Sequence, residues 1–194
     1  MNSRLIYFDF ETTGLNVFND RVIEYCFKDE KEQKTIQGLI KIKKKLSKEI
    51  ENITGITDDM LSLAKKIDTH QDKMLSFLDN THNNYLIAHN GHNFDRFFLQ
   101  RILKKWETTT KNQNIKFIDT IHLAKYIFPG NKSYSQKNLC IQFNITSGNH
   151  RAEADVIALE KLYHILLFHL SSKINIKPHI LLNNPDIIYD LLYI

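Results

Sequence analysis

The stretch Tyr7–Leu15, YFDFETTGL, places two acids inside a hydrophobic run. Leu5–Phe10 is almost entirely apolar, as expected for a central strand that is covered on both faces. Because side chains alternate along a strand, Asp9 and Glu11 should point to the same side, about 6.5–7 Å apart along it. Glu11 also comes at the carboxyl end of the strand, which is the edge where open α/β sheets place their ligand sites. The two acids therefore form a candidate functional pair.

Two further acids are predicted to face inward from helices. In HNGHNFDRFFLQRIL, Asp95 lies one helical turn before the apolar stripe that begins with Phe98. In HRAEADVIALEKLYHILL, Asp155 is in register with Leu159 and Leu162 near the beginning of a long helix. We therefore expect four carboxylates from three parts of the chain to be directed at one site.

Four carboxylates on one site repel one another, by about 4 kcal/mol per pair 4 Å apart at an effective dielectric constant near 20. A cation relieves this repulsion, and oxygen-only ligands suit Mg²⁺ or Mn²⁺. Two such ions about 3.5–4 Å apart can bind the attacking and leaving oxygens of a phosphoryl displacement. The neutral imidazole of His150, five residues before Asp155, is the candidate base for the attacking water. The pattern favours metal-dependent hydrolysis of phosphodiesters.

The order of the expected elements indicates an α/β fold with a mixed sheet covered by helices. The expected strands are Leu5–Phe10, Arg21–Phe27, Thr35–Ile42, Tyr85–Ala88 and Ile115–Ile118. Helices are expected within Ser47–Leu78 and over Phe94–Trp106, Thr120–Phe128, Gln136–Phe143 and Glu153–Leu170. We expect one domain over residues 1–171, with the tail 172–194 forming short helical turns packed on it.

Composition narrows the class of protein without identifying it. The 194 residues suit one domain with a sizeable core. The net charge of +4 suits a polyanionic partner. Cys26 and Cys140 have neither disulfide nor metal spacing, so two buried free thiols and a reducing compartment are expected. Since no stretch is apolar enough for a membrane span, we expect a soluble intracellular protein, cytoplasmic or nuclear, with no membrane partner.

Three motifs carry a resemblance to a known family. DFETTGL, HNGHNFDRFFL and HRAEAD resemble the exonuclease motifs of the DEDDh 3′-to-5′ exonucleases, and the connectors ITGITDDML, FIDTIHLAKYI and KSYSQKNLC follow in the expected order. The resemblance implies a ribonuclease-H-like fold with a five-stranded mixed sheet and two Mg²⁺ ions, for which Mn²⁺ would substitute. It implies that Asp9, Glu11 and Asp155 bind one metal, that Asp9 and Asp95 serve the second, and that His150 is the general base.

Motif spacing is most similar to that of the three-prime repair exonucleases. This likeness implies release of nucleoside 5′-monophosphates from single-stranded 3′ ends, with DNA favoured, and a homodimer through the edge strand near residues 35–42. It also implies contacts to the terminal nucleotides from Thr12, Thr13, Leu15, Ile53, Thr54, Asn90, Phe94, Ser133 and Tyr134. Leu15 would wedge against the last bases, an apolar contact that suits sequence-tolerant capture of an unpaired end.

Two alternatives remain open from the sequence. The first is an RNA-trimming exoribonuclease or oligoribonuclease of the same fold, since the 2′-hydroxyl is what a pocket would sense. The second is a polymerase-associated nucleic-acid-binding module with the apolar tail as its docking element. The basic run KIKKKLSKE can be either a nucleic-acid groove or a solvated face.

Overall fold

The computed structural model describes residues 3–78, 82–103 and 115–194. It contains one five-stranded sheet, in the order β3-β2-β1-β4-β5. The strands are β1 (Ser3–Thr12), β2 (Val22–Asp29), β3 (Thr35–Leu39), β4 (Asn83–Ala88) and β5 (Ile115–Asp119). The central strand β1 is antiparallel to β2 and parallel to β4, β2 is antiparallel to β3, and β4 is parallel to β5. The predicted mixed five-stranded sheet is confirmed.

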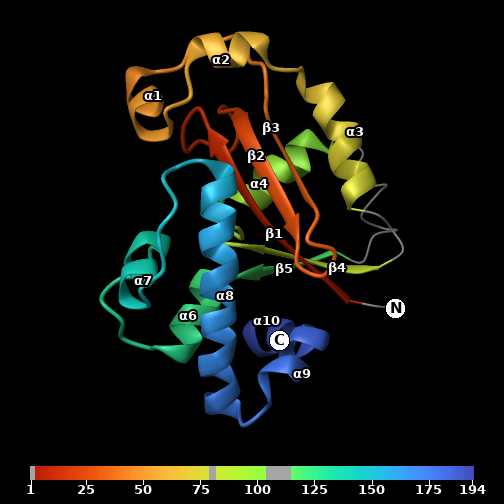
Figure 1. The fold of residues 1–194 in the computed structure, drawn as a ribbon, viewed down its shortest axis with the longest axis vertical. Coiled ribbons are helices and arrows are strands. Elements are labelled where there is room, and N and C mark those ends of the chain that lie inside the picture. Colours follow the sequence, from red (N-terminus) through yellow and green to blue (C-terminus); the bar gives the residue numbers. More distant parts are fainter. Residues whose placement is uncertain (1–2, 79–81, 104–114) are drawn as a thin grey trace.

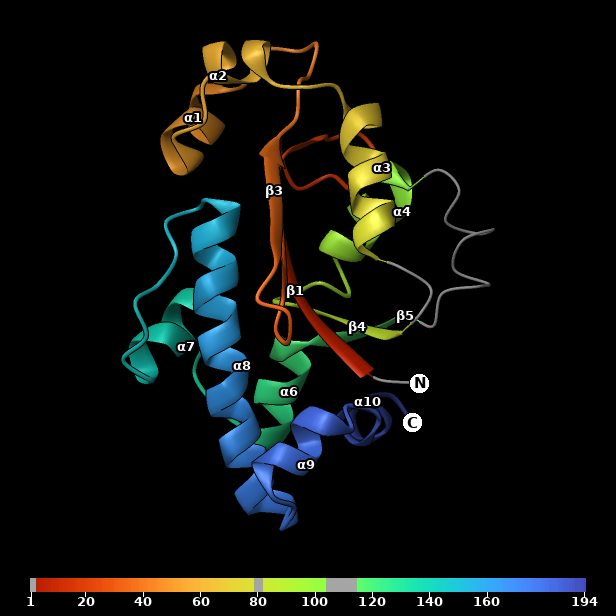
Figure 2. The ribbon, with the colours of Figure 1, turned by 45° about the vertical axis from the view of Figure 1, so that its right-hand side comes forward.

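Helices cover both faces of this sheet (Figure 1). They are α1 (Lys48–Thr54), α2 (Asp58–Leu63), α3 (Ile67–Phe77), α4 (Asp95–Ile102), α6 (Thr120–Ile127), α7 (Gln136–Gln142), α8 (Ala152–Ile174), α9 (Pro178–Asn183) and α10 (Asp186–Tyr193). Figure 2 shows α6 and α8 on one side of the sheet and α3 and α4 on the other. The helix α8 therefore faces the side of β1 that lies opposite α4.

Successive side chains of β1 point to opposite faces of the sheet. Leu5 and Tyr7 belong to the core cluster that contains the buried residues of α8. Ile6 and Phe8 belong to the cluster on the other face, which contains the buried residues of α3 and α4. Asp9 is in phase with Leu5 and Tyr7, so it lies on the α8 side. A register shift between Glu11 and Thr12 ends the regular pairing of β1 with β2 at this edge.

Two expected elements end earlier than the sequence indicated. β3 stops at Leu39 rather than Ile42. The Ile40 backbone N–H still donates to the Ile23 oxygen of β2 at 2.8 Å, but Ile40 also forms a bridge with Lys65, and the Lys41 N–H donates to the Lys65 oxygen at 2.9 Å instead of to β2. The helix expected over Phe94–Trp106 begins one residue later, with Phe94 as its N-cap, and ends at Ile102. Trp106 lies outside the described residues.

The helix α8 runs past the position at which the tail was expected to begin. It continues through residue 171 and ends at Ile174, where Asn175 adopts a left-handed conformation with φ of 55°. The following helices α9 and α10 bury Leu181 and Ile188 completely in the same core cluster as α8. The chain from α8 onward thus contributes side chains to the main core.

Candidate active site

Three of the four predicted acids meet at the carboxyl end of β1. Carboxylate oxygens of Asp9, Glu11 and Asp155 all lie within 4.8 Å of one another. Asp9 and Glu11 come from β1, whereas Asp155 comes from the first turn of α8. The long helix α8 packs along β1, so its N-terminal turn lies beside the end of the strand (Figure 1).

The fourth acid, Asp95, is the first residue of α4 and is only 3% exposed. After burial, its charge is the largest influence that raises the pKa of Asp9 above the ordinary value. Burial raises the pKa of Asp95 itself to about 7, although backbone N–H groups of Asp95 and Phe10 act in the opposite direction. Asp95 at the N-terminus of α4 therefore lies close enough to Asp9 for the two charges to repel.

Burial and mutual repulsion make these acids hold protons more tightly than ordinary carboxyls. The pKa of Glu11 is raised to about 8, first by burial and then by the charges of Asp155 and Glu24. Burial also raises the pKa of Asp155, against the lowering effects of His150 and of backbone N–H groups. A cation bound among these groups would remove that penalty, because it favours the ionised form of each acid.

The hydrogen bonding of two buried carboxylate oxygens shows whether the acids can bind such a cation. Asp95 Oδ1 and Asp155 Oδ2 have no hydrogen-bond partner within the described part of the chain. Buried polar atoms are normally paired, so an unpaired carboxylate oxygen facing other carboxylates is a free ligand. All the donors are hard oxygens, as Mg²⁺ and Mn²⁺ prefer. The residues present therefore fit a divalent metal.

His150 lies on the loop directly before α8, with φ of 57°, and is exposed. Its charge lowers the pKa of Asp155, so the imidazole stands close to this acid. The helix N-terminus thus positions Asp155 inside the cluster and His150 at its solvent-facing rim.

Glu24 on β2 is a site residue that the sequence reasoning missed. Its carboxylate accepts hydrogen bonds from Arg151 Nη2 at 2.6 Å and Arg151 Nε at 3.0 Å, and from the backbone N–H of Ala152 at 3.0 Å. The ion pair anchors the first turn of α8, and with it Asp155, to the sheet. The available signal was an acid within the otherwise apolar strand VIEYCF.

Two more contacts to Asp155 were not foreseen. Gln136 Nε2 donates to the backbone oxygen of Asp155 at 3.0 Å and to its Oδ1 at 3.4 Å. Gly148 leaves room for the Asp155 carboxylate, because a Cβ at Gly148 would stand 2.1 Å from Oδ1. Neither contact follows from the hydrophobic periodicity of a helix or strand, so the sequence pattern could not reveal it.

The loop that leads from β4 to Asp95 is held by Asp119, which was also missed. The Asp119 carboxylate accepts the backbone N–H groups of Asn90 at 3.0 Å, His92 at 3.1 Å and Ile121 at 2.9 Å. His92, Asp119 and His122 lie close together, and the Tyr193 ring stacks on His92 with 4.6 Å between centroids. Asp119 is thus committed to shaping the backbone beside the site.

Of the predicted substrate contacts after β1, one side chain is exposed and two form hydrogen bonds within the protein. Leu15 is 85% exposed on the loop that follows β1. Thr12 Oγ1 donates to the backbone oxygen of Gly14 at 2.7 Å, and Thr13 Oγ1 donates to Asp20 Oδ1 at 2.8 Å. Both threonine hydroxyls therefore shape the loop that presents Leu15, while their backbone positions directly follow Glu11.

The predicted substrate contacts from α1 and from the region of α4 likewise include both exposed side chains and side chains that contact other parts of the protein. Ile53 is 45% exposed, whereas Thr54 is buried and donates to the backbone oxygen of Ile50 at 2.8 Å. Phe94 is half-buried and packs edge-on against Phe98, with ring centroids 5.0 Å apart. Asn90 is exposed beside this loop, with φ of 64°.

Ser133 and Tyr134 lie on the loop before α7. The Tyr134 hydroxyl donates to the backbone oxygen of Phe128 at 2.6 Å and accepts the backbone N–H of Asn131 at 3.0 Å. Ser133 Oγ accepts the backbone N–H of Ser135 at 3.3 Å. These side chains stabilise the loop. The backbone carbonyl of Tyr134 interacts with His89, which follows β4.

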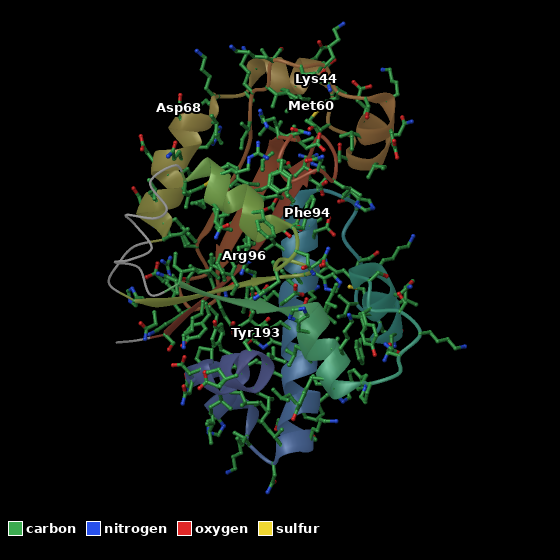
Figure 3. The ribbon with its side chains drawn as sticks, turned by 180° about the vertical axis from the view of Figure 1, so that it is seen from behind. Lys44, Met60, Asp68, Phe94, Arg96 and Tyr193 are labelled. Carbon is green, nitrogen blue, oxygen red and sulfur yellow. The ribbon has the colours of Figure 1, made fainter. Side chains whose placement is uncertain are left out.

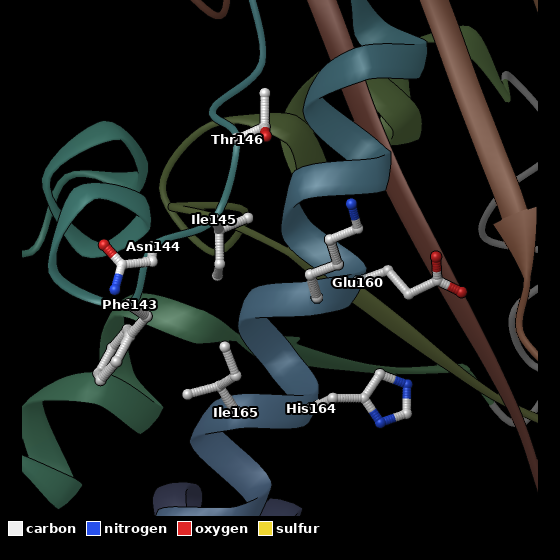
Figure 4. Close-up of a pocket in the computed structure, with 8 residues that line it drawn as sticks. Phe143, Asn144, Ile145, Thr146, Glu160, His164 and Ile165 are labelled. Carbon is white, nitrogen blue, oxygen red and sulfur yellow. The ribbon is translucent and has the colours of Figure 1, made fainter.

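A separate cavity of about 480 Å³ lies against α8 (Figure 4). It is lined by Phe143, Asn144, Ile145, Thr146, Glu160, Lys161, His164 and Ile165. None of the four acids borders this cavity. The candidate active site is therefore the acid cluster at the carboxyl end of β1.

Comparison with known proteins identifies the family. Residues 6–163 match the model of the RNase T exonuclease family. The chain belongs to that exonuclease family. The recognition of a DEDDh exonuclease of the ribonuclease-H-like superfamily is thus confirmed, and with it a nuclease of the hydrolase class for which metal binding is typical. The closer likeness to three-prime repair exonucleases stays a prediction.

Relatives and structures similar to this exonuclease domain agree with that placement. It is 35% identical over 170 residues to the DNA polymerase III PolC-type of Mycoplasma genitalium, covering 84% of this chain and 11% of that protein. It is 34% identical to the Bacillus subtilis PolC-type polymerase, covering 79% of this chain and 11% of that protein. The chain therefore spans about a ninth of the length of these relatives.

The fold of the exonuclease domain is similar to that of a solved nuclease. A zinc-bound complex of E. coli ExoI with single-stranded DNA superimposes with a TM-score of 0.73 at 16% identity, covering 89% of this chain and 41% of that one. At this identity the likeness concerns the fold. Over the described ranges 3–78, 82–103 and 115–194, none of the helices has the length and apolarity needed to span a bilayer.

Proposed function

We propose that this exonuclease domain is a 3′-to-5′ exonuclease that releases nucleoside 5′-monophosphates from single-stranded nucleic acid, with DNA favoured. The convergence of Asp9, Glu11 and Asp155 within 4.8 Å carries the proposal. Membership of the exonuclease family supports it. The 3′ direction and the preference for DNA rest on the motif resemblance and on the PolC-type relatives.

In the proposed site, Asp9, Glu11, Asp95 and Asp155 bind two Mg²⁺ ions, which Mn²⁺ can replace. Two bound ions would supply stabilisation of the attacking and leaving oxygens of the scissile phosphodiester. His150 accepts the proton of the attacking water, since a neutral imidazole is a base near physiological pH. Asp155 and His150 act together because one helix N-terminus carries both.

The proposed substrate contacts surround this cluster. Leu15, with Ile53 and Phe94, packs against the terminal bases, since base stacking on apolar and aromatic side chains tolerates any sequence. The backbone at Thr12, Thr13 and Thr54 and the loops at Asn90, Ser133 and Tyr134 contact the sugar and phosphates. We assign these roles to backbone groups where the side-chain hydroxyls are already bonded within the protein.

The direct test is hydrolysis of an oligonucleotide that carries a label on its 3′-terminal nucleotide. With Mg²⁺, the label should be released as a mononucleotide, and Asp9→Asn or His150→Ala should reduce the rate by orders of magnitude. His179→Ala, which changes an exposed histidine of α9 at the opposite end of α8 from Asp155 (Figure 1), is the matched control and should retain the parent rate. Release that continues unchanged in the Asp9 variant, or only internal cleavage, would contradict the proposal.

A polymerase-associated role is the second candidate, because the similar curated proteins are PolC-type DNA polymerases. In this role the domain would remove nucleotides from a DNA end beside a polymerase. Matched DNA and RNA oligonucleotides, compared at one salt concentration, separate the DNA roles from the RNA-trimming alternative, since phosphate-driven affinity depends on salt. Faster hydrolysis of RNA would favour the exoribonuclease.

We also propose that the domain dimerises through β3, an edge strand whose outer side pairs with no other strand in the described part of the chain. Edge strands offer free backbone groups to a second copy. Light scattering during gel filtration measures the mass directly. A dimer that becomes a monomer on Gln37→Pro, which alters the exposed middle of β3, supports this; a monomer at all concentrations contradicts it.

A further inference from the structure

A groove of about 760 Å³ runs beside α4, outside the acid cluster. Its walls come from the β1–β2 loop, the segment after β3, the start of α3 and the outer part of α4. The lining residues are Thr13, Asn19, Asp20, Arg21, Val22, Ile40, Lys41, Ile42, Lys43, Lys44, Ile67, Asp68, Gln71, Phe98, Arg101 and Ile102. Figure 3 views the molecule from this side, with Phe94 labelled at the N-terminal end of α4 and Lys44 and Asp68 labelled above the helix. None of the four acids lines the groove.

The groove is strongly basic. Its cationic residues are Arg21, Lys41, Lys43, Lys44 and Arg101, against the two acids Asp20 and Asp68. The guanidinium groups of Arg21 and Arg101 lie close enough that Arg21 lowers the pKa of Arg101, after the larger effect of burial. Cations gathered in a concave surface attract an anionic chain, because the low-dielectric walls focus their field.

Some of these cationic side chains form hydrogen bonds that stabilise the fold, whereas others are exposed and available to a ligand. Arg101 Nη1 donates to the backbone oxygens of Val17 and Asp20 and so holds the β1–β2 loop. Lys41 Nζ donates to the backbone oxygen of Ser62 at 2.6 Å. Lys43 and Lys44 are exposed, and neither forms an ion pair with any residue that the structure describes. These two lysines can therefore bind a ligand without breaking a contact.

Below the charged rim, the groove has an apolar floor. Its apolar lining residues are Val22, Ile40, Ile42, Ile67, Phe98 and Ile102. A rim of cations over an apolar floor suits single-stranded nucleic acid, whose phosphates bind the rim while its bases lie on the floor. It suits an acidic peptide with apolar side chains less well here, because Thr13, which lines the groove, follows the acid Glu11 by only two residues.

Continuity with the acids follows from the elements that build the groove. Phe98 and Arg101 lie on the same helix as Asp95, so Arg101 is about 9 Å further along the helix axis at 1.5 Å per residue. Thr13 lines the groove and comes two residues after Glu11. A strand with its 3′ end among the acids can thus continue beside α4.

We propose that this groove binds the phosphate backbone of single-stranded nucleic acid on the 5′ side of the scissile bond, with Lys43 and Lys44 as phosphate contacts. This assignment rests on the proposed exonuclease function. It also gives the basic run KIKKKLSKE a role, since Lys41, Lys43 and Lys44 of that run all line the groove.

The test compares two double variants that remove the same charge. Lys43→Gln/Lys44→Gln alters the groove, whereas Lys31→Gln/Lys34→Gln alters two exposed lysines in the β2–β3 turn. Fluorescence anisotropy with a 5′-labelled oligothymidylate of about 15 nucleotides, in chelator and at several salt concentrations, measures binding without hydrolysis. Losing two phosphate contacts should reduce the slope of log affinity against log salt by about 1.4. The Lys31/Lys34 variant should keep the parent slope.

Kinetics provide a second measurement. With Mg²⁺, the ratio of kcat/KM for the long oligonucleotide to kcat/KM for a dinucleotide should fall by about tenfold in the Lys43/Lys44 variant, because only the long strand reaches the groove. An unchanged salt slope overturns the proposal. So does an acidic, apolar-rich peptide that binds the parent more tightly than the oligonucleotide and loses as much affinity in the variant. If the salt slope falls but neither the parent nor any variant hydrolyses an oligonucleotide, binding of nucleic acid in the groove is supported and the proposed exonuclease function fails.

Discussion

Gly148 lies directly against Asp155, because a Cβ at position 148 would stand 2.1 Å from Asp155 Oδ1 and 2.8 Å from the Asp155 α-carbon. Only a residue without a side chain allows this approach. The loop that carries His150 can therefore close tightly over the first turn of α8. The position of the Asp155 carboxylate depends on that closure.

The variant Gly148→Ala should weaken metal binding and hydrolysis by about 10- to 100-fold, as expected when a neighbour that orients a metal ligand is altered. The added methyl must displace either the loop or Asp155. Gly38→Ala is the control, because its Cβ would meet the His70 ring at 3.0 Å, away from the acids. Isothermal titration with Mn²⁺ measures the affinity. A normal affinity in Gly148→Ala would show that the loop absorbs the methyl group freely.

Breaking the Glu24–Arg151 pair should destabilise the domain. The Glu24 side chain is 8% exposed, and Arg151→Met leaves its carboxylate with the backbone N–H of Ala152 as the one remaining donor among the residues that the structure describes. Stranding a nearly buried charge should cost about 2 kcal/mol, less than a fully buried pair because Arg151 is partly exposed. Urea unfolding measures the change. The control Lys48→Met breaks the exposed Lys48–Glu51 pair and should leave stability unchanged.

The double variant Glu24→Gln/Arg151→Met extends this test. Since the glutamine side chain introduced in place of Glu24 carries no charge, the double variant should recover part of the loss seen in Arg151→Met. Equal losses in the single and double variants would indicate that the guanidinium stabilises α8 through packing alone.

Removing the metal should make stability fall as pH rises. Glu11 and Asp95 have folded-state pKa values raised to about 8 and about 7, so each binds its proton more tightly when folded. Their stabilising effect is fully present below the unfolded pKa values near 4 and is lost as pH rises through the folded values. The Tm of the metal-free protein should therefore fall as pH rises from about 4 to about 8 and level off above that.

Metal binding should show the reciprocal dependence. A divalent ion competes with protons for the same oxygens, so Mn²⁺ should bind more tightly and raise Tm more at about pH 8.5 than at about pH 6. Thermal scans at both pH values measure this. Glu11→Gln, which removes one of the titrating ligands, should reduce the pH dependence. An effect of Mn²⁺ on Tm that is the same at both values would argue against binding at these acids.

The residues after α8 should behave as part of the main core. Ile188→Ala removes a fully buried side chain of α10 and should destabilise the domain by about 2–4 kcal/mol. Ile194→Ala removes a side chain that is 96% exposed and should change stability by less than about 0.5 kcal/mol. Chemical denaturation compares the two. A small effect of Ile188→Ala would instead favour a tail that docks loosely on the body.

Local patterns predicted most of the architecture. The apolar run Leu5–Phe10 and the alternating segments after it indicated five strands in the right places, and the helical stripe around Phe98 and Leu99 is buried as expected. Boundaries were less accurate where a tertiary contact intervened. β3 ended before Ile42 because the Lys41 N–H bonds to the Lys65 oxygen, and α8 continued to Ile174 because its later turns pack against α9.

The sequence alone determined the order of the elements, the mixed sheet and the four acids, because these depend on periodicity and on residue type over short distances. Only the tertiary structure decided which side chains support the acids: Glu24 opposite Arg151, Gly148 against Asp155, and Lys43 and Lys44 beside α4. Such contacts join segments far apart in the chain. Their geometry is set by how strands are ordered and helices packed, and no local pattern records that.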